Sequence, residues 1–134
     1  MVVEKDLPWL GQLLYDECEK VRSGGLTVDW SPLEAHEFLG RIWKRKDYHI
    51  EVIRHSNQIT AVCGVTLIRP VLPPHPLTCV EWLWWGVASK DTAQVLIPCK
   101  AWGKAQGAEY FQYALAQPQK NTRKFIEHYQ WVRL

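Results

Sequence analysis

Apolar residues recur every three or four positions in the first third of the chain, and this spacing predicts two amphipathic helices. The first is expected to begin with Asp6 as its N-cap, just before Pro8, and to end after Ser23, where two glycines follow. The second is expected to begin at Ser31, which forms a capping box with Glu34, and to end at the cations that follow its apolar face.

From position 48 the apolar period changes to two, which is typical of strands. Residues 48–54 and 58–69 are each expected to form a strand. Ser56 and Asn57 lie between them as a tight turn. The pattern therefore predicts a β-hairpin.

A third strand is expected at residues 78–88, after a proline-rich connection. The alternation of a pleated strand places Trp82 and Trp84 on one face and Leu83 and Trp85 on the other. Apolar side chains on both faces predict a central strand that is covered on both sides.

A third helix is expected from Asp91, as its N-cap, to about Gln106, with Gly107 following its C-cap. Pro98 must kink this helix or restart it, because proline lacks the N–H that a helix interior needs. Residues 109–116 are then expected as a fourth strand.

The last part of the chain is expected to form a short helix at residues 121–128 and a final strand at 130–134. The order of elements predicts one domain over residues 1–134 in the α/β (α+β) class. We expect a mixed, mainly antiparallel sheet with helices on both faces.

The 134 residues carry 16 lysines and arginines against 14 aspartates and glutamates, a net charge of +2. This balance argues against a dedicated nucleic-acid coat and against nucleic acid as the main partner. One basic patch beside Trp43 still leaves nucleic-acid binding open as a third hypothesis. Its members are Arg41, Lys44, Arg45 and Lys46.

No apolar run approaches the roughly 18 residues that a membrane-spanning helix needs, and the N-terminal residues lack the features of a signal peptide. The four cysteines are widely spaced, which predicts reduced and mostly buried thiols. We therefore expect a cytoplasmic protein that has no membrane partner. His75 and Cys79 together supply too few ligands for a zinc site, so no metal is predicted.

Four segments, in the right order, resemble the GNAT superfamily of N-acetyltransferases. They are residues 6–10, 81–88, 101–108 and 121–131. The resemblance implies that the family's fourth and fifth strands, here 78–88 and 109–116, splay apart and hold the pantetheine arm of acetyl-CoA between them. It also implies that the following loop binds the pyrophosphate at a helix N-terminus.

By this resemblance, the cofactor-binding residues would lie at the end of the third strand, in the loop after it and near the last helix. They are Trp85, Val87, Ala88, Lys90, Thr92, Ala93 and Asn121. The family's phosphate loop carries glycines, whereas residues 87–94 have none. Asp91 would place a negative charge where the pyrophosphate should lie, and Lys90 compensates in charge but not in shape.

Two residues are candidates for acid–base catalysis. Glu81 is a candidate general base, because a carboxylate beside tryptophans can have a raised pKa. The alternative is that Glu81 pairs with Arg69 on the neighbouring strand. Where the family has a tyrosine general acid this chain has Ile126, and Tyr129 is the phenol nearest to it.

The resemblance also implies a truncated C-terminal strand, which would leave a sheet edge open to a partner protein or to a second copy. The chain is also similar to small GNAT-like proteins of tailed bacteriophages, which act in the host cytoplasm or in the virion. The first hypothesis is therefore a scaffold that binds protein and needs no cofactor, as a virion component or an inhibitor of a host protein. The alternative is an N-acetyltransferase that moves acetyl from acetyl-CoA to a primary amine.

Eight tryptophans are a surplus for a chain of this length, and such rings are enriched at protein interfaces. If docking is the function, exposed aromatic side chains are expected near Trp9, Trp30 or Trp131.

Overall fold

The computed structural model describes residues 2–23, 30–69, 76–118 and 125–134, and it describes side chains at 2–19, 30–69, 76–114 and 130–134. The described chain forms two compact units. The sheet unit contains residues 2, 45–113 and 129–134, and the helical unit contains residues 3–44 and 114–128. The single domain over residues 1–134 stays a prediction.

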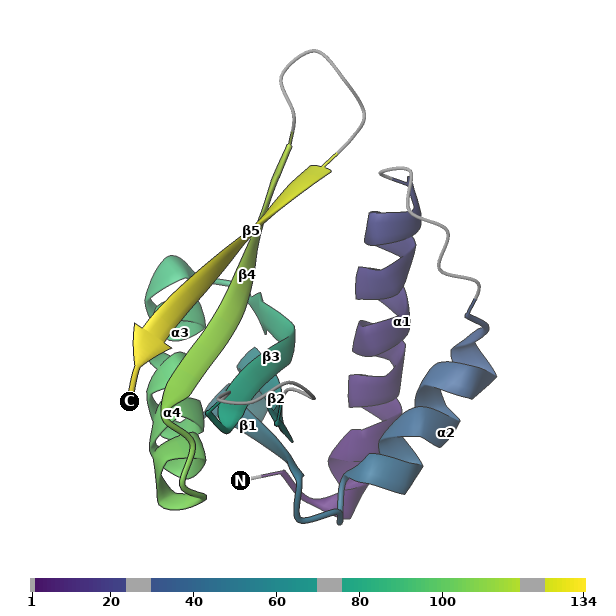
Figure 1. Ribbon diagram of the computed structural model, residues 1–134. Helices are drawn as coiled ribbons and strands as arrows, with labels where there is room; N and C mark the ends of the chain where they lie inside the picture. The colour runs from purple at the N-terminus through teal and green to yellow at the C-terminus, as the bar shows by residue number, and fades with distance from the viewer. Residues whose placement is uncertain (1, 24–29, 70–75, 119–124) are drawn as a thin grey trace. The chain divides into compact units, whose positions relative to one another are not determined.

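The helical unit begins with a short 3-10 helix, η1 (Glu4–Asp6), which leads directly into α1 (Leu7–Ser23). The next helix, α2 (Pro32–Ile42), packs beside α1 (Figure 1). Leu10 of α1 and Leu39 of α2 are fully buried. The predicted pair of amphipathic helices is confirmed.

The two predicted helix starts have different outcomes. Ser31 caps α2 as predicted, because its Oγ accepts a hydrogen bond from the backbone N–H of Glu34 at 3.2 Å. Asp6 does not cap α1, since it lies inside η1 and its carboxylate accepts from the backbone N–H of Val3 at 2.8 Å. The cap position has moved upstream to Val3 because η1 continues into α1 without a break.

The sheet has five strands in the order of the chain. They are β1 (Tyr48–His55), β2 (Gln58–Ile68), β3 (Thr78–Gly86), β4 (Tyr110–Pro118) and β5 (Phe125–Arg133). The first three pair antiparallel, and β3 pairs with β4 in parallel. The predicted mixed, mainly antiparallel sheet with helices is therefore confirmed.

The turn between β1 and β2 is the tight hairpin that the sequence predicted. Ser56 and Asn57 have φ angles of 51° and 67°, both in the left-handed region. Two successive residues in this region give the turn a twist that matches the twist of the flanking strands.

The connection from β3 to β4 contains two helices instead of the predicted single one. They are α3 (Ser89–Gln94) and α4 (Leu96–Ala105). Pro98 restarts the helix, because it lies in the first turn of α4, where its missing N–H costs nothing. Gly107 has a φ of 89° after α4, which confirms its predicted position. Asp91 is not an N-cap, since α3 begins after Ala88.

A β-bulge changes the expected faces of β3. Gly64 pairs with Leu83 and Val65 pairs with Glu81, so Trp82 is an extra residue on β3. The Trp82 ring lies over Gly64, where an added Cβ would be 2.5 Å from it, while Trp84 packs on the opposite face, against the buried cluster under α4. The prediction that both rings share one face is wrong, because the bulge resets the alternation.

The end of the chain also differs from the expectation. Residues 125–128 belong to strand β5, so the helix predicted at 121–128 is wrong where the structure describes it. Residues 121–124 lie outside the described part. The predicted final strand at residues 130–134 lies largely within β5.

The core of the sheet unit lies between β1–β4 and α4, and three cysteines and a phenylalanine belong to it. Cys63, Cys79, Cys99 and Phe111 are fully buried in this cluster. All four cysteines of the chain, including Cys18, are free thiols, as predicted. Burial first, and the neighbouring Cys99 second, raise the pKa of Cys79 to about 12, so this thiol stays protonated and structural.

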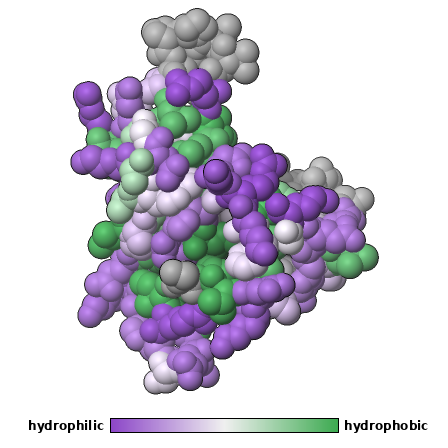
Figure 2. All heavy atoms as spheres, turned by 90° about the horizontal axis from the view of Figure 1, so that it is seen from below, coloured by the Kyte–Doolittle hydropathy of each residue, from purple (hydrophilic) through white to green (hydrophobic). Residues whose placement is uncertain are grey.

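Large apolar side chains are also exposed at several separate places in the described chain. They are Val3, Trp9, Leu33, Ile68, Val87, Ile97 and Trp131. On the face that Figure 2 shows, apolar residues lie among polar ones. None of the helices in the described residues combines the length and the apolar composition needed to cross a membrane.

Candidate functional site: a pocket at the junction of β3 and α3

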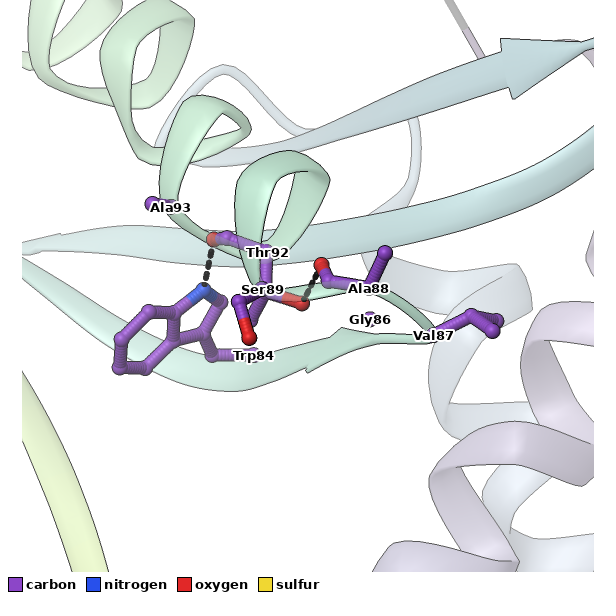
Figure 3. A pocket seen from close by; sticks show the side chains of 7 residues that line it. All are labelled: Trp84, Gly86, Val87, Ala88, Ser89, Thr92 and Ala93. Atoms are coloured by element: carbon purple, nitrogen blue, oxygen red, sulfur yellow. Dashed lines mark hydrogen bonds between the residues drawn. The ribbon is translucent and has the colours of Figure 1, made fainter.

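A pocket of about 330 Å³ opens where β3 ends and α3 begins (Figure 3). Its lining comes from the end of β3, the short connection and one side of α3. The lining residues are Trp84, Gly86, Val87, Ala88, Ser89, Thr92 and Ala93. Because these seven side chains carry no formal charge, the pocket surface is neutral.

Close approach of α3 to the strand end shapes this pocket. Thr92 binds back to Ala88, with its Oγ donating to the Ala88 carbonyl at 2.8 Å and its N–H donating to the same oxygen at 3.0 Å. Gly86 permits the approach, since an added Cβ there would lie 2.8 Å from the Cβ of Thr92 and 3.0 Å from its Cα. Gly86 therefore lets the helix begin directly against β3.

The Trp84 side chain forms one wall of the pocket. Its indole Nε1 donates a hydrogen bond to the Thr92 carbonyl at 2.7 Å (Figure 3). Its ring meets the Tyr113 ring of β4 edge-on, with the centroids 5.5 Å apart and an interplanar angle of 82°. One ring pair thus joins β3 to β4 next to the pocket.

Asp91 does not face the pocket, contrary to the expectation from the sequence. Its carboxylate accepts hydrogen bonds from the hydroxyl of Thr60 and pairs with Nε2 of His55, each at 2.8 Å. The Thr60 hydroxyl first, and His55 second, hold the pKa of Asp91 below its usual range. The negative charge is bound to the β1–β2 hairpin, because the helical turn directs Asp91 away from the side that lines the pocket.

Four of the predicted cofactor residues line the pocket, namely Val87, Ala88, Thr92 and Ala93. Trp85 and Lys90 are not in the lining. Trp85 pairs with Val62 and lies on the other face of β3. Asn121 lies outside the described residues. The cofactor role of all seven stays a prediction.

Sequence reasoning missed three lining residues. They are Trp84, Gly86 and Ser89. Gly86 could have been found, because a glycine at the end of an aromatic strand marks a close backbone approach. Trp84 could not, because its direction depends on the bulge at Trp82.

The two catalytic candidates are not brought together in the described residues. Glu81 is half-buried, pairs with Val65 and is absent from the pocket lining. Its charge is one of the smaller influences that raise the pKa of the buried Cys63 thiol, after the hydrogen bond to Cys99 and burial itself. Tyr129 belongs to β5, and its side chain is outside the described set. Both catalytic roles stay predictions.

In the part of the chain that the structure covers, no group of three or more His, Cys, Asp or Glu side chains could hold a metal ion. His75, considered with Cys79 as a ligand pair, lies outside that part. Nothing in the described geometry therefore adds ligands to this pair.

The chain is similar in fold to several solved structures of acetyltransferases. No protein-family model and no curated protein sequence matches it. A ribosomal-protein-alanine N-acetyltransferase from Brucella melitensis matches with a TM-score of 0.67 and 15% identity, over 99% of this chain and 97% of that one. A predicted acetyltransferase from Clostridium acetobutylicum, determined with acetyl-CoA, matches with a TM-score of 0.69 and 11% identity, over 85% and 77% of the two chains.

An acetyltransferase of the GNAT family from Streptococcus pneumoniae matches with a TM-score of 0.56 and 12% identity, over 84% of this chain and 70% of that one. At these identities the likeness concerns the fold. The chain has a GNAT fold, as the sequence resemblance implied.

The side chains around the pocket differ in two respects from what the family resemblance implies for acetyl-CoA. The pantetheine arm would enter between the family's fourth and fifth strands, here β3 and β4. In this chain the Trp84 ring of β3 packs edge-on against the Tyr113 ring of β4. The lining contains no lysine or arginine, because Lys90 is not part of it.

Proposed function

We propose that this chain is a GNAT-fold protein that acts by binding another protein and does not transfer acetyl groups. The observation that carries the proposal is the Trp84 indole, bonded to Thr92 and packed on Tyr113 where a cofactor arm would pass. The strand conformation of residues 125–128 supports it, because the resemblance puts the end of the helix with the family's general acid there.

The partner is proposed to bind along β5, which is the last strand of the five-stranded sheet in the described chain. An edge strand presents backbone groups to which an extended segment of another protein can add as a further strand. Trp131 on β5 is 58% exposed, and Arg133 beside it is also exposed. An exposed tryptophan with a neighbouring arginine is the composition of an interface hot spot.

This function agrees with the phage-type resemblance of the sequence. A virion component and an inhibitor of a host protein would both act through an open strand edge without a cofactor. The virion or the host cytoplasm would then be the place of action.

Acetyl transfer is tested by the release of coenzyme A thiol from acetyl-CoA over a broad panel of amines and peptides. We expect no release above the rate without protein. Transfer at enzyme-like rates, on the order of one turnover per second, would overturn the proposal.

Partner binding is tested by placing a photo-crosslinking amino acid at Trp131 in cells that produce the protein. The matched control places it at Trp9, an aromatic residue of similar exposure, 42%, in the helical unit. We expect a crosslinked product from position 131 and none from position 9. A product of twice the chain mass would identify a second copy as the partner, and no product at 131 would contradict the proposal.

An N-acetyltransferase acting on a primary amine is the second candidate. The position of the pocket at the end of β3 favours it. In that case Glu81 would be the base, Tyr129 the acid, and Glu81→Gln would lower kcat by about a hundredfold or more.

A further inference from the structure

We propose that Trp84 sets the ligand selectivity of the pocket by closing it toward β4, so that the pantetheine arm of a coenzyme A thioester is excluded. This inference rests on the proposed absence of acetyl transfer, and it names Trp84 as the residue that causes this absence. It predicts that a single substitution restores cofactor binding.

Several interactions fix the indole in its closing position. The bond from Nε1 to the Thr92 carbonyl, 2.7 Å long, holds one edge of the ring against α3. The edge-on contact with Tyr113 holds the ring against β4. Trp84 also pairs with Cys63 and packs against the buried cluster under α4. A ring held from three sides keeps one orientation, so the wall that it forms is permanent.

Trp84 is also the one large side chain in the lining. The other six lining residues are glycine, alanine, serine, threonine or valine. Truncating any of them would add little space, whereas removing the indole would extend the pocket toward Tyr113. The depth of the pocket therefore depends on one residue.

The described backbone pairing between β3 and β4 does not extend to Trp84 and Tyr113. Its register in the described residues runs from Thr78–Tyr110 to Val80–Gln112. Trp84 and Tyr113 both lie beyond the last of these pairs. At this level of the sheet the two strands are therefore joined by the contact between these rings, which a substitution can remove.

The test is calorimetric titration of acetyl-CoA into the wild type and into Trp84→Phe, Trp84→Leu and Trp84→Ala. We expect affinity to rise as the side chain shrinks, reaching at least about a tenfold gain for the alanine variant. The matched control is Trp102→Ala, because Trp102 packs on the same buried cluster but does not line the pocket. This control should bind as the wild type does.

A second ligand tests whether the gain in affinity comes from the pantetheine arm. The adenosine bisphosphate portion of coenzyme A lacks the pantetheine arm, so its affinity should be the same for all variants. A gain for this nucleotide that equals the gain for acetyl-CoA would overturn the inference, because the block would then not act on the arm.

Circular dichroism shows which variants are folded, and only those are compared. Trp84→Phe keeps a ring in the packed site, and Tyr113→Ala opens the same gap from the other side. Equal acetyl-CoA affinity of the wild type and the folded variants overturns the inference, whether all of them bind or none does. Acetyl transfer by the wild type would instead overturn the proposed function, so the two failures are distinguishable.

Discussion

The two ends of β3 contact different helices, and they differ in how completely they are packed. At the start of the strand, Cys79 is fully buried, pairs with Phe111 and contacts Gly103 of α4. At the end of the strand, Trp84 is half-buried and walls a pocket of about 330 Å³ against α3. At the start of the strand, Cys79 and Gly103 let α4 approach until no space is left, whereas at its end the indole is bonded to α3 and a pocket remains beside it. The start of β3 is therefore built for stability, and its end can receive a ligand.

The largest expected effect is a loss of folding stability at the start of β3. Phe111→Ala removes a fully buried ring and should lower the free energy of unfolding by about 3–5 kcal/mol. Chemical denaturation measures it, and Ile97→Ala on the exposed side of α4 is the control, since Ile97 is 64% exposed. A loss below about 1 kcal/mol for Phe111→Ala would contradict the description of this end as the core.

Gly103→Ala tests the packing of α4 against the start of β3. An added Cβ would lie 2.8 Å from the Cβ of Cys79 and 2.9 Å from its Sγ, so the helix or the strand must shift. We expect a loss of about 1–3 kcal/mol in a denaturant titration. Gly40→Ala on α2 meets nothing within 4 Å and should be stabilising by up to about 1 kcal/mol. Equal effects at the two glycines would show that α4 does not pack this closely.

Thr60→Val probes how α3 is held beside the pocket. A carboxyl whose folded pKa is lowered stabilises the fold above its unfolded pKa, and this contribution is lost as the pH falls through the folded pKa. Removing the Thr60 hydroxyl, the main cause of the low pKa of Asp91, should therefore reduce the difference in Tm between neutral pH and about pH 3.

The control for this experiment is Thr66→Val. The Thr66 hydroxyl bonds the backbone carbonyl of Asp47 at 2.9 Å, a contact that does not titrate. It should lower Tm about equally at both pH values. A Tm difference in Thr60→Val that matches the wild type would refute the role assigned to Asp91.

The smallest effect is expected at the edge of the sheet. Glu51 accepts a hydrogen bond from His49 at 2.7 Å, and His49, its main influence, lowers the pKa of Glu51. As for Asp91, a lowered folded pKa means that Glu51 stabilises the fold above the unfolded pKa of its carboxyl. This stabilisation is lost in acid. Glu51→Gln should cost under about 1 kcal/mol near neutral pH and nothing in acid, measured against Glu37→Gln on α2. A cost that grows in acid would reverse the sign and contradict the pairing.

Several local features followed from short-range rules as predicted, although the N-caps predicted at Asp6 and Asp91 were wrong. The capping box at Ser31, the turn at Ser56 and Asn57, the restart at Pro98 and the left-handed Gly107 each depend on a few neighbouring residues. Cap geometry and φ preferences act over one turn of chain, so the amino-acid order contains the whole signal. Resemblance to the GNAT family in turn predicted the fold, and four of the residues that it named line the pocket.

The errors about the pocket arose from contacts between segments that are far apart in the sequence. The bulge at Trp82 arises in the pairing of β2 with β3, and it decides which tryptophan faces α4 and the pocket. The direction of Asp91 depends on Thr60, which is 31 residues away. Local spacing contains neither contact.

By itself, the sequence determined the first two helices, the hairpin and the free thiols, and the family resemblance named four residues of the pocket lining. Only the tertiary structure decided that Trp84 walls the pocket and that Asp91 is bound outside it. The physical reason is that periodicity fixes the face on which a side chain begins, whereas pairing and packing with remote strands fix what it finally contacts.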